Sequence, residues 1–501
     1  MSPDVLSRLA SLQEADLPVL GGRTLAYVYD SGSAEVDRIG RAAVAAYAGS
    51  NGLDPTAFPS LLTMENDLVR FAAPLLDAPE TVVGSVTSGG TESVLLAVQG
   101  ARDARPDITH PRMLLPSTAH AAFHKAAHYF GVEPVLVPVG ADFRADAEAM
   151  AAAVDDRTVL LVASAPSYAH GVVDPVPAIA AAAAARGIRC HVDACIGGWV
   201  LPYAARLGRA VPPWTFAVEG VTSISVDLHK YGYAPKGVSL LLHRDPSLRR
   251  PQYFASAAWP GYTMLNSTMQ STKSGGPLAG AWAVTQHLGH EGYEALTTEV
   301  LETVDRIVAG VADIPALSVV AQPDSTLIAL ACDETCDPFT ICDEMAEARW
   351  FVQPQMSFDG HPATVHLSVS AATLAGVDDF LTALAGAVAR AVEAGPVAVD
   401  PEVVAFIEAL DPTALSDADF DGLLAASGLL GDGGSHADSD GASDGDSAGA
   451  SDGGSDSEGA RGGLQLPERM AEVNALLDVA APAMREALLI AFLDRLQRPT
   501  P

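Results

Sequence analysis

The stretch Ser223-Ile-Ser-Val-Asp-Leu-His-Lys-Tyr-Gly-Tyr-Ala-Pro-Lys-Gly237 decides how the rest of the chain is interpreted. It begins within a β-rich run, Val221–Val226, and continues into a polar segment that holds Lys230 and Lys236. The chain has only four lysines, so two of them six residues apart at one strand exit are improbable by chance. A lysine in a desolvated site is the usual Schiff-base nucleophile. The stretch therefore predicts a reactive amine at the end of a strand.

Around this stretch, from about residue 60 to 290, short β-rich runs alternate with Ala-rich helical runs. The other β-rich runs are Thr81–Val86, Met113–Pro116, Pro134–Val139, Thr158–Ala163 and Ile188–Asp193, and the helical runs include Ser93–Ala104 and Ala178–Arg186. This alternation predicts βαβ units in a mostly parallel sheet with helices on both faces. Strands near Ser325–Ala331 and Thr364–Ser368, between two helices, predict a smaller α/β domain that follows.

Two further strand ends carry residues that suit a ligand. Ser88-Gly89-Gly90-Thr91-Glu92 is a Gly-rich turn that opens a helix, and its free N–H groups favour a phosphate. Asp193 ends another strand and can pair with a cationic ligand nitrogen, although a turn or N-cap aspartate is the plain structural alternative. Phosphate turn, carboxylate and lysine together are what pyridoxal 5'-phosphate needs.

The chain resembles the group II pyridoxal-phosphate-dependent decarboxylase family, in particular its sphingosine-1-phosphate lyase-like members. The resemblance runs from about residue 30 to 390. Besides the opening stretch, it rests on Val86-Thr-Ser-Gly-Gly-Thr-Glu-Ser93, Ser117-Thr-Ala-His-Ala-Ala-Phe123, His170-Gly-Val-Val-Asp-Pro-Val176 and His191-Val-Asp-Ala-Cys-Ile-Gly-Gly198. It implies the aspartate aminotransferase-like fold of type I pyridoxal-phosphate enzymes, with a large sheet domain and a small C-terminal α/β domain.

The resemblance also implies roles for single residues. Lys230 would form the Schiff base, Asp193 would pair with the pyridine nitrogen, and His120 would stack on the ring, unless it is only a loop histidine. Gly90 and Thr91 would hold the cofactor phosphate, with His229 nearby.

Other matches concern the substrate and the oligomer. Ser271-Thr272-Lys273 matches a segment that reaches the phosphate of the neighbouring subunit in relatives, which implies a homodimer with shared active sites. Relatives carry Arg at the position of Lys273. Lys236 matches a second family lysine near the substrate. For His191, a purely structural role is favoured.

Some positions depart from the family pattern. Members that cleave phosphorylated sphingoid bases carry a Val-Tyr pair after an early Ser-Gly, whereas Ser31-Gly32 here is followed by Ser-Ala-Glu35. Asp54 stands where they carry His, and a family Tyr is replaced by Met264, with Tyr262 two residues earlier. Carboxylates at Glu35 and Asp54 would repel a substrate phosphate and favour a neutral or cationic substrate tail.

The function expected from these residues is a lyase that breaks a carbon–carbon bond at Cα of an amine or amino acid. Decarboxylation and retro-aldol cleavage by an aldehyde-lyase both need the same electron sink, and the sequence does not select between them. An aminotransferase on the same fold, and a non-catalytic scaffold with an acidic tail, are the alternatives.

Composition limits the setting in which the protein works. The chain has 501 residues, with 62 acidic and 29 basic side chains and a formal net charge of −33. Such a surface argues against nucleic-acid partners and anionic membranes. The acidic, lysine-poor composition fits a cytoplasm with high salt, although codon bias in an Ala-rich and Arg-rich genome explains it equally well. The lack of a Cys-x-x-Cys pair argues against a metal site, and the lack of a signal peptide or a long apolar run favours a cytoplasmic protein without a membrane span.

Composition shifts suggest six segments. They are an N-terminal arm with helices (1–60), a large cofactor-binding domain (61–295), a small α/β domain (296–395), a helical extension (396–430), a disordered acidic linker (431–463) and C-terminal helices (464–501) that are broken at Pro482. The linker contains eight acidic residues and a single Arg, so it cannot form a core.

Overall fold

The computed structural model describes residues 3–426 and 469–498. The chain divides into two compact units, residues 1–393 and 394–501. The first unit holds the predicted large and small domains, and the second holds the C-terminal helices. Each unit is described by itself.

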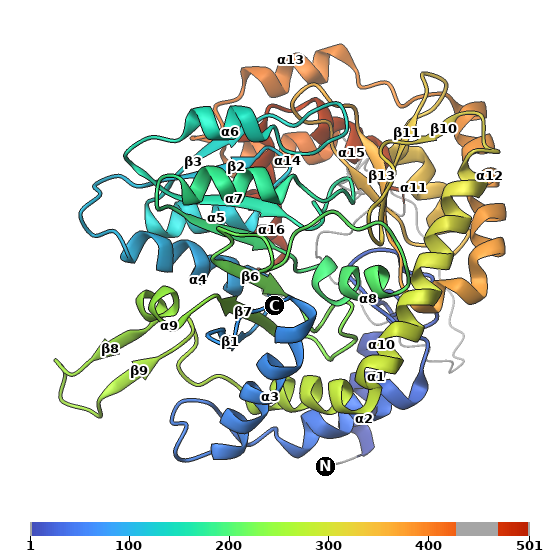
Figure 1. The fold of residues 1–501 in the computed structure, drawn as a ribbon. Coiled ribbons are helices and arrows are strands. Elements are labelled where there is room, and N and C mark those ends of the chain that lie inside the picture. Colours follow the sequence, from blue (N-terminus) through green and yellow to red (C-terminus); the bar gives the residue numbers. More distant parts are fainter. Residues whose placement is uncertain (1–2, 427–468, 499–501) are drawn as a thin grey trace, which may run out of the picture. The chain divides into compact units, whose positions relative to one another are not determined.

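The first unit is built on a seven-stranded sheet with the order β1-β7-β6-β5-β4-β2-β3 (Figure 1). Its strands are β1 (Val83–Thr87), β2 (Arg112–Pro116), β3 (Glu133–Val137), β4 (Thr158–Ser164), β5 (Arg189–Asp193), β6 (Ser223–Val226) and β7 (Ser239–His243). Neighbouring strands from β3 to β6 pair in parallel, and only β7 runs antiparallel to its neighbours β1 and β6. The predicted mostly parallel sheet is therefore confirmed, and β7 is the strand that the sequence pattern missed.

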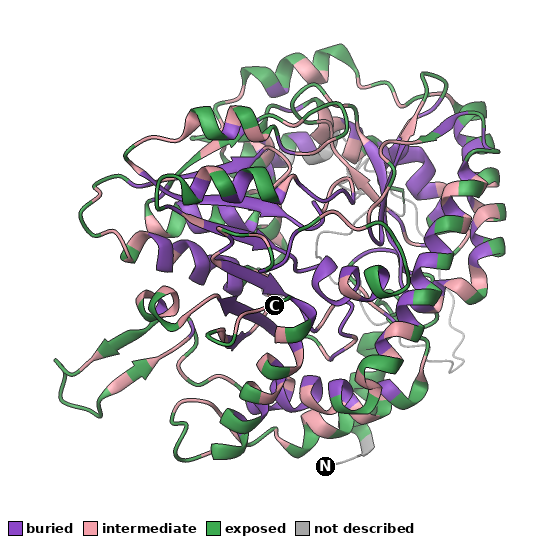
Figure 2. Ribbon diagram, in the orientation of Figure 1, coloured by how far each residue is buried: buried purple, intermediate pink, exposed green. Residues whose placement is uncertain are grey.

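Helices cover the sheet, as parallel strands connected through helices require. Every residue of β4, β6 and β7 is buried, and the strands form the buried centre of Figure 2. The covering helices are α4 (Gly90–Asp103), α5 (Ala122–Phe130), α6 (Ala147–Ala153), α7 (Val176–Ala184) and α8 (Leu201–Arg206), together with α3 (Pro59–Leu75) and the long α10 (Gly275–Val311). Gly289 interrupts α10 with a φ of 55°, so this helix bends there.

One edge of the sheet collects the carboxyl ends of the strands that carry the predicted site. β7 is antiparallel to both β1 and β6, so β1 points in the same direction as β4, β5 and β6. The turn after Thr87, the end of β5 at Asp193 and the segment after Val226 therefore open at the same edge. This is where ligands bind in open parallel sheets.

The small domain is a four-stranded antiparallel sheet with the order β10-β11-β13-β12. It consists of β10 (Leu317–Val319), β11 (Leu327–Cys332), β12 (Gln353–Gln355) and β13 (Thr364–Ser368), with α11 (Pro338–Glu347) and α12 (Val377–Ala394). Among the described residues, the helical stretch Ala371–Ala394 is long and apolar enough to span a membrane. Phe380, Leu384 and Ala387 on it are buried in the main core, and 39% of its most apolar part is buried.

Two peripheral parts of the first unit matter for the site. The hairpin of β8 (Phe254–Ser256) and β9 (Met264–Asn266), which follows the short α9 (Pro246–Arg249), extends away from the large sheet in Figure 1. The N-terminal part contains α1 (Pro3–Gln13) and α2 (Ala34–Ala46).

The second unit is helical and has a core of its own. Its helices are α13 (Pro401–Ala409), α14 (Asp417–Ala426), α15 (Ala471–Val479) and α16 (Pro482–Leu496). Ile407, Phe420, Leu423, Met484 and Leu488 are buried against one another. The two segments predicted as a helical extension and as C-terminal helices thus pack together, and α16 begins at Pro482, where the break was predicted. The predicted acidic linker lies outside the described residues.

Candidate active site

A cavity of about 370 Å³ lies at the carboxyl edge of the large sheet. Its lining includes six of the residues predicted to hold the cofactor: Gly90, Thr91, His120, Asp193, His229 and Lys230. Ser88, Glu92, Ser164, Tyr168, Cys195 and Asp227 also line it and were not predicted. The sequence carries a signal for Asp227, because this carboxylate stands three residues before Lys230 at the same strand exit.

Lys230 forms a close ion pair inside the cavity. Its Nζ lies 3.0 Å from Oδ2 of Asp227, a carboxylate that is 1% exposed at the end of β6. Burial by itself lowers the pKa of Lys230, but the negative charge of Asp227 outweighs it and the pKa is raised well above its usual value. Burial likewise tends to raise the pKa of Asp227, but Lys230 and His229 lower it. The pair therefore holds a proton on the amine until a ligand competes for the carboxylate.

Asp193 ends β5 and faces the cavity with a defined orientation. Its Oδ1 accepts a hydrogen bond from the backbone N–H of Cys195 at 3.1 Å and one from the hydroxyl of Ser225 at 3.4 Å. The residue is 8% exposed and lines the cavity with Lys230. Such a carboxylate can accept a hydrogen bond from a protonated ring nitrogen.

Two histidines border the same space in fixed orientations. His120 accepts a hydrogen bond at Nδ1 from the backbone N–H of Ala122 at 3.1 Å, which leaves its proton on Nε2. His229 accepts at Nδ1 from the N–H of Val238 at 3.1 Å. Desolvation lowers the pKa of both rings. His120 can therefore present a neutral ring face to a flat ligand.

The Gly89-Gly90 turn is shaped by its lack of side chains. Gly89 has a φ of 152°, and Gly90 is the first residue of α4, whose N-terminal N–H groups point out of the helix. A Cβ on Gly90 would lie 2.7 Å from Oδ2 of Asp227 and 2.8 Å from Sγ of Cys195. The turn thus lies so close to the Lys230–Asp227 pair that there is no room for a side chain at Gly90.

These observations fit pyridoxal 5'-phosphate. The helix N-terminus behind Gly89-Gly90 suits its phosphate, Asp193 its pyridine nitrogen and Lys230 its aldehyde. All three groups face one cavity.

Two glutamates, the buried Glu92 and the half-buried Glu65, link the phosphate turn to the segment after the β8–β9 hairpin. Glu92 accepts hydrogen bonds from the backbone N–H groups of Ser88 at 2.5 Å and Met269 at 2.7 Å. Glu65 accepts from the N–H of Val86 at 2.7 Å, and Lys273 donates to the carbonyl oxygen of Val86 at 2.8 Å. Hydrogen bonds therefore hold segment 267–273 against the end of β1 and the turn that follows it.

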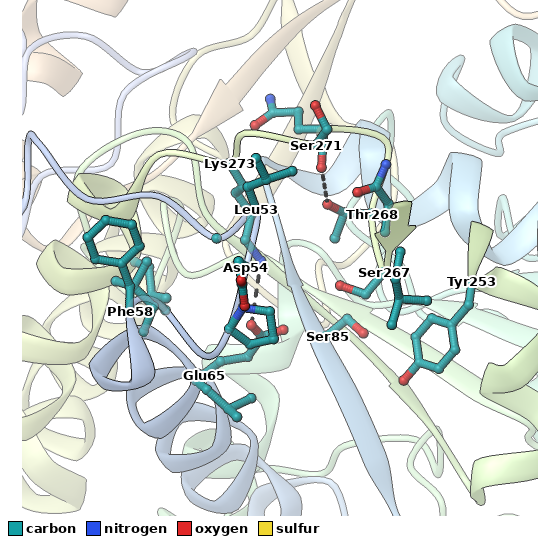
Figure 3. Close-up of a pocket in the computed structure, with 18 of the residues that line it drawn as sticks. Leu53, Asp54, Phe58, Glu65, Ser85, Tyr253, Ser267, Thr268, Ser271 and Lys273 are labelled. Atoms are coloured by element: carbon teal, nitrogen blue, oxygen red, sulfur yellow. Dashed lines mark hydrogen bonds and ion pairs between the residues drawn. The ribbon is translucent and has the colours of Figure 1, made fainter. Parts of the chain in front are cut away.

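The remaining predicted residues lie elsewhere. A second cavity, of about 760 Å³, is bordered by Asp54, Tyr262, Ser271 and Lys273, and Figure 3 shows three of them around it. Lys230 does not line this cavity, and Thr272 lines neither cavity. Within one chain, the structure thus does not bring the predicted partner-reaching segment to the cofactor cavity.

The prediction that Glu35 belongs to the substrate pocket does not fit this structure. Glu35 is exposed on α2, lines neither cavity and makes two hydrogen bonds of 2.7 Å to Arg38, one turn away on the same helix. These bonds lower its pKa.

Tyr29, which the sequence reasoning did not single out, lies close to Lys236. Its ring lies 4.8 Å from Nζ of Lys236, and burial raises its pKa to about 12, an effect that Lys230 partly offsets. The Nζ of Lys236 also donates to the carbonyl oxygens of Tyr27 at 2.8 Å and His229 at 3.4 Å.

Known proteins are similar to this chain in sequence and in fold. Residues 37–332 match the pyridoxal-dependent decarboxylase conserved domain, and residues 438–495 match the C-terminal putative HTH domain of pyridoxal-dependent enzymes. Sphingosine-1-phosphate lyase of Arabidopsis thaliana is 39% identical over 70% of this chain and 65% of its own length, and that of Oryza sativa subsp. japonica is 35% identical over 76% and 71%. The chain thus spans about two thirds of these relatives.

Solved structures agree. The sphingosine-1-phosphate lyase of Burkholderia pseudomallei superimposes with a TM-score of 0.73 at 34% identity, over 78% of this chain and 91% of that one. Glutamate decarboxylase of Lactobacillus brevis, at 19% identity and a TM-score of 0.68, shares the fold. Since the conserved-domain match spans more than half of the residues, the protein belongs to the pyridoxal-dependent decarboxylase family.

Proposed function

We propose that the protein is a pyridoxal-phosphate-dependent lyase that breaks a carbon–carbon bond at Cα of a small amino compound. The observation that carries this proposal is the single cavity that Lys230, Asp193 and the Gly89-Gly90 turn all line. The bound cofactor would supply the electron sink that stabilises the carbanion left when the bond breaks.

The residues of this chain would hold the reactants and the protons. Asp227 keeps the proton on Nζ of Lys230, at 3.0 Å, and its carboxylate would accept that proton when the amine reacts. Asp193 would accept a hydrogen bond from the ring nitrogen. His120 would cover one ring face and keep water from it.

Of the two lyase reactions, we favour retro-aldol cleavage of an amino alcohol that carries an anionic head group. Curated relatives at 31–39% identity are named sphingosine-1-phosphate lyase. The carboxylate of Glu35, which argued against a phosphate, points into solvent with Arg38. Tyr29 and Lys236 lie together instead, and Lys236 also donates to the carbonyl oxygen of His229, which lines the cavity of Lys230.

Decarboxylation of an amino acid is the second candidate. A protein named probable L-tyrosine/L-aspartate decarboxylase, from Methanothermobacter thermautotrophicus, is 30% identical over 60% of this chain. The test is to incubate the purified protein with phosphorylated and unphosphorylated amino alcohols and with a panel of amino acids. Aldehyde from the amino alcohols supports the proposal, carbon dioxide supports decarboxylation, and a keto acid would show an aminotransferase and refute both.

We also propose that the protein works as a homodimer whose sites are shared. Ser271 and Lys273 border a cavity that is separate from that of Lys230, which supports a role for them at the site of another chain. The hairpin before them exposes large apolar side chains, Phe254, Trp259 and Leu265, as a protein interface would.

Mixed dimers test the sharing of sites. A Lys230→Ala chain and a Ser271→Asp chain are each expected to be inactive, because the second places a negative charge where the partner's cofactor phosphate would lie. If sites are shared, a mixed dimer contains one intact site and recovers activity. Failure to recover activity in proven mixed dimers would refute sharing, and Ser247→Asp, on the exposed Asp245-capped turn, is the control for added charge.

The second unit is proposed not to bind nucleic acid, despite its match to a putative HTH domain. Its described residues carry eleven acidic side chains and four arginines, a balance that repels phosphate backbones. A fluorescence-anisotropy titration with duplex DNA at low salt is expected to show no binding, and salt-sensitive binding would overturn this proposal.

A further inference from the structure

A row of buried polar side chains is hydrogen-bonded to Asp193, and apart from Asp193 its members do not line the cavity. His191 and Asp193 are two residues apart on β5 and so share one face of the sheet. In the β5–β6 register they stand opposite Ser223 and Ser225. All four residues are at most 8% exposed. Buried polar groups in such a cluster must satisfy one another, so the direction of each hydrogen bond can be worked out.

The hydrogen bonds run in one direction. An ionised Asp193 can only accept, so the hydroxyl of Ser225 donates to its Oδ1 at 3.4 Å. Ser225 must then accept from the ring N–H at Nε2 of His191, at 3.2 Å. Nδ1 of a neutral imidazole is an acceptor, and the hydroxyl of Ser223 donates to it at 2.9 Å. Burial lowers the pKa of His191 to about 4, in agreement with a neutral ring.

These hydrogen bonds fix one carboxylate oxygen of Asp193, Oδ1, and leave Oδ2 for a ligand. Both hydrogen bonds found for its carboxylate among the described residues, from Cys195 N–H and from Ser225, go to Oδ1. Since Asp193 lines the cavity, Oδ2 remains available there. Without His191, the hydroxyl of Ser225 could turn to another acceptor, because a serine hydroxyl rotates freely.

We propose that His191 is a positioning residue for the cofactor, which acts through Ser225 to hold Asp193 with one oxygen directed at the pyridine nitrogen. This inference rests on the proposed cofactor site and deepens it. It gives a functional role to a histidine for which the sequence favoured a purely structural one. A structural histidine would contribute to folding alone, whereas a positioning histidine contributes to one contact of the ligand.

The test compares two ligands that differ at one atom. Pyridoxal 5'-phosphate and its 1-deaza analogue, which has carbon in place of the ring nitrogen, are titrated into cofactor-free wild type, Ser225→Ala and His191→Phe, and bound ligand is measured by absorbance. The wild type is expected to prefer the natural cofactor. Because a hydrogen bond to a charged group is worth about one to two powers of ten in affinity, each variant should bind the natural cofactor about tenfold or more weakly. Binding of the analogue, which cannot contact Asp193, should be unchanged.

Two further variants separate positioning from packing. His191→Gln places an amide N–H near the position of Nε2 and is expected to restore most of the preference for the natural cofactor. His243→Phe is the matched control, because His243 is buried in the same sheet and its Nε2 bonds Gln252 at 3.0 Å. This control is expected to keep the preference of the wild type.

The outcomes are distinguishable. Equal weakening of both ligands by Ser225→Ala and His191→Phe, or a preference that survives in both, would overturn the positioning role. A wild type that binds the cofactor but cleaves no amino compound would refute the proposed lyase and leave this inference standing. A wild type that binds neither ligand would overturn both.

Discussion

Replacement of Gly90 by alanine is expected to destabilise the protein and to weaken the cofactor site together. The added Cβ would lie 2.7 Å from Oδ2 of Asp227 and 2.8 Å from Sγ of Cys195. To reach an ordinary contact of 3.4 Å, the carboxylate oxygen must move by about 0.7 Å. Asp227 cannot move freely, because it is 1% exposed and is paired with Lys230 at 3.0 Å.

The size of the effect follows from this geometry. Overpacking of a well-filled site costs about 1–3 kcal/mol. We expect Gly90→Ala to lose that amount of unfolding free energy in urea, and to bind pyridoxal 5'-phosphate at least tenfold more weakly, because the methyl group also narrows the turn that faces the phosphate.

The same helix offers the control. A Cβ on Gly100 would meet Nη1 of Arg189 at 3.5 Å, an ordinary contact, so Gly100→Ala should stabilise α4 by about 0.5–1 kcal/mol and leave cofactor binding unchanged. Both variants are compared with the wild type by urea unfolding and by cofactor titration. Wild-type stability and cofactor affinity in Gly90→Ala would refute the reasoning about the turn.

Further predictions concern charge and covalent attachment. Lys230→Ala should abolish the yellow absorbance of the holoenzyme and the adduct fixed by borohydride, and an adduct on another lysine would contradict the assignment. Glu92→Gln should lower the unfolding free energy by about 1–3 kcal/mol, as measured by urea titration. The carboxylate of Glu92 accepts hydrogen bonds from two backbone N–H groups, and in the variant one of these donors would face the amide NH₂, which is itself a donor. The environment of Lys236 lowers its pKa to about 8, chiefly through desolvation, so its ammonium charge is present below pH 8 and lost above it. Inhibition by an anionic amine should therefore weaken from pH 7 to 9 in the wild type but not in Lys236→Arg, and equal pH profiles would exclude this role. Deletion of residues 431–463 should leave cofactor binding intact, since eight acidic residues among Gly, Ser and Ala cannot form a core, and a folded variant without cofactor absorbance would show otherwise.

The sequence predicted those parts of the site that are determined locally. The end of a strand, a Gly-Gly turn and the start of a helix follow one another along the chain, so the positions of Gly90 and Asp193 at the sheet edge could be inferred from periodicity and turn chemistry alone. Lys230 was identified in the same way, because a rare residue type is conspicuous at a strand exit.

Only the tertiary structure decided which distant side chains meet. β7 was missed because its run Ser239–His243 follows the polar segment closely, and its pairing with both β1 and β6 depends on a long-range register. Glu35 is an exception, because the pairing that keeps it in solvent is local: Arg38 lies three residues later on the same helix. Segment 271–273 lies at a separate cavity, because Lys273 is bonded to the end of β1, a strand almost two hundred residues earlier. Local patterns determine where a side chain leaves the backbone, whereas the packing of elements far apart in sequence determines what it touches.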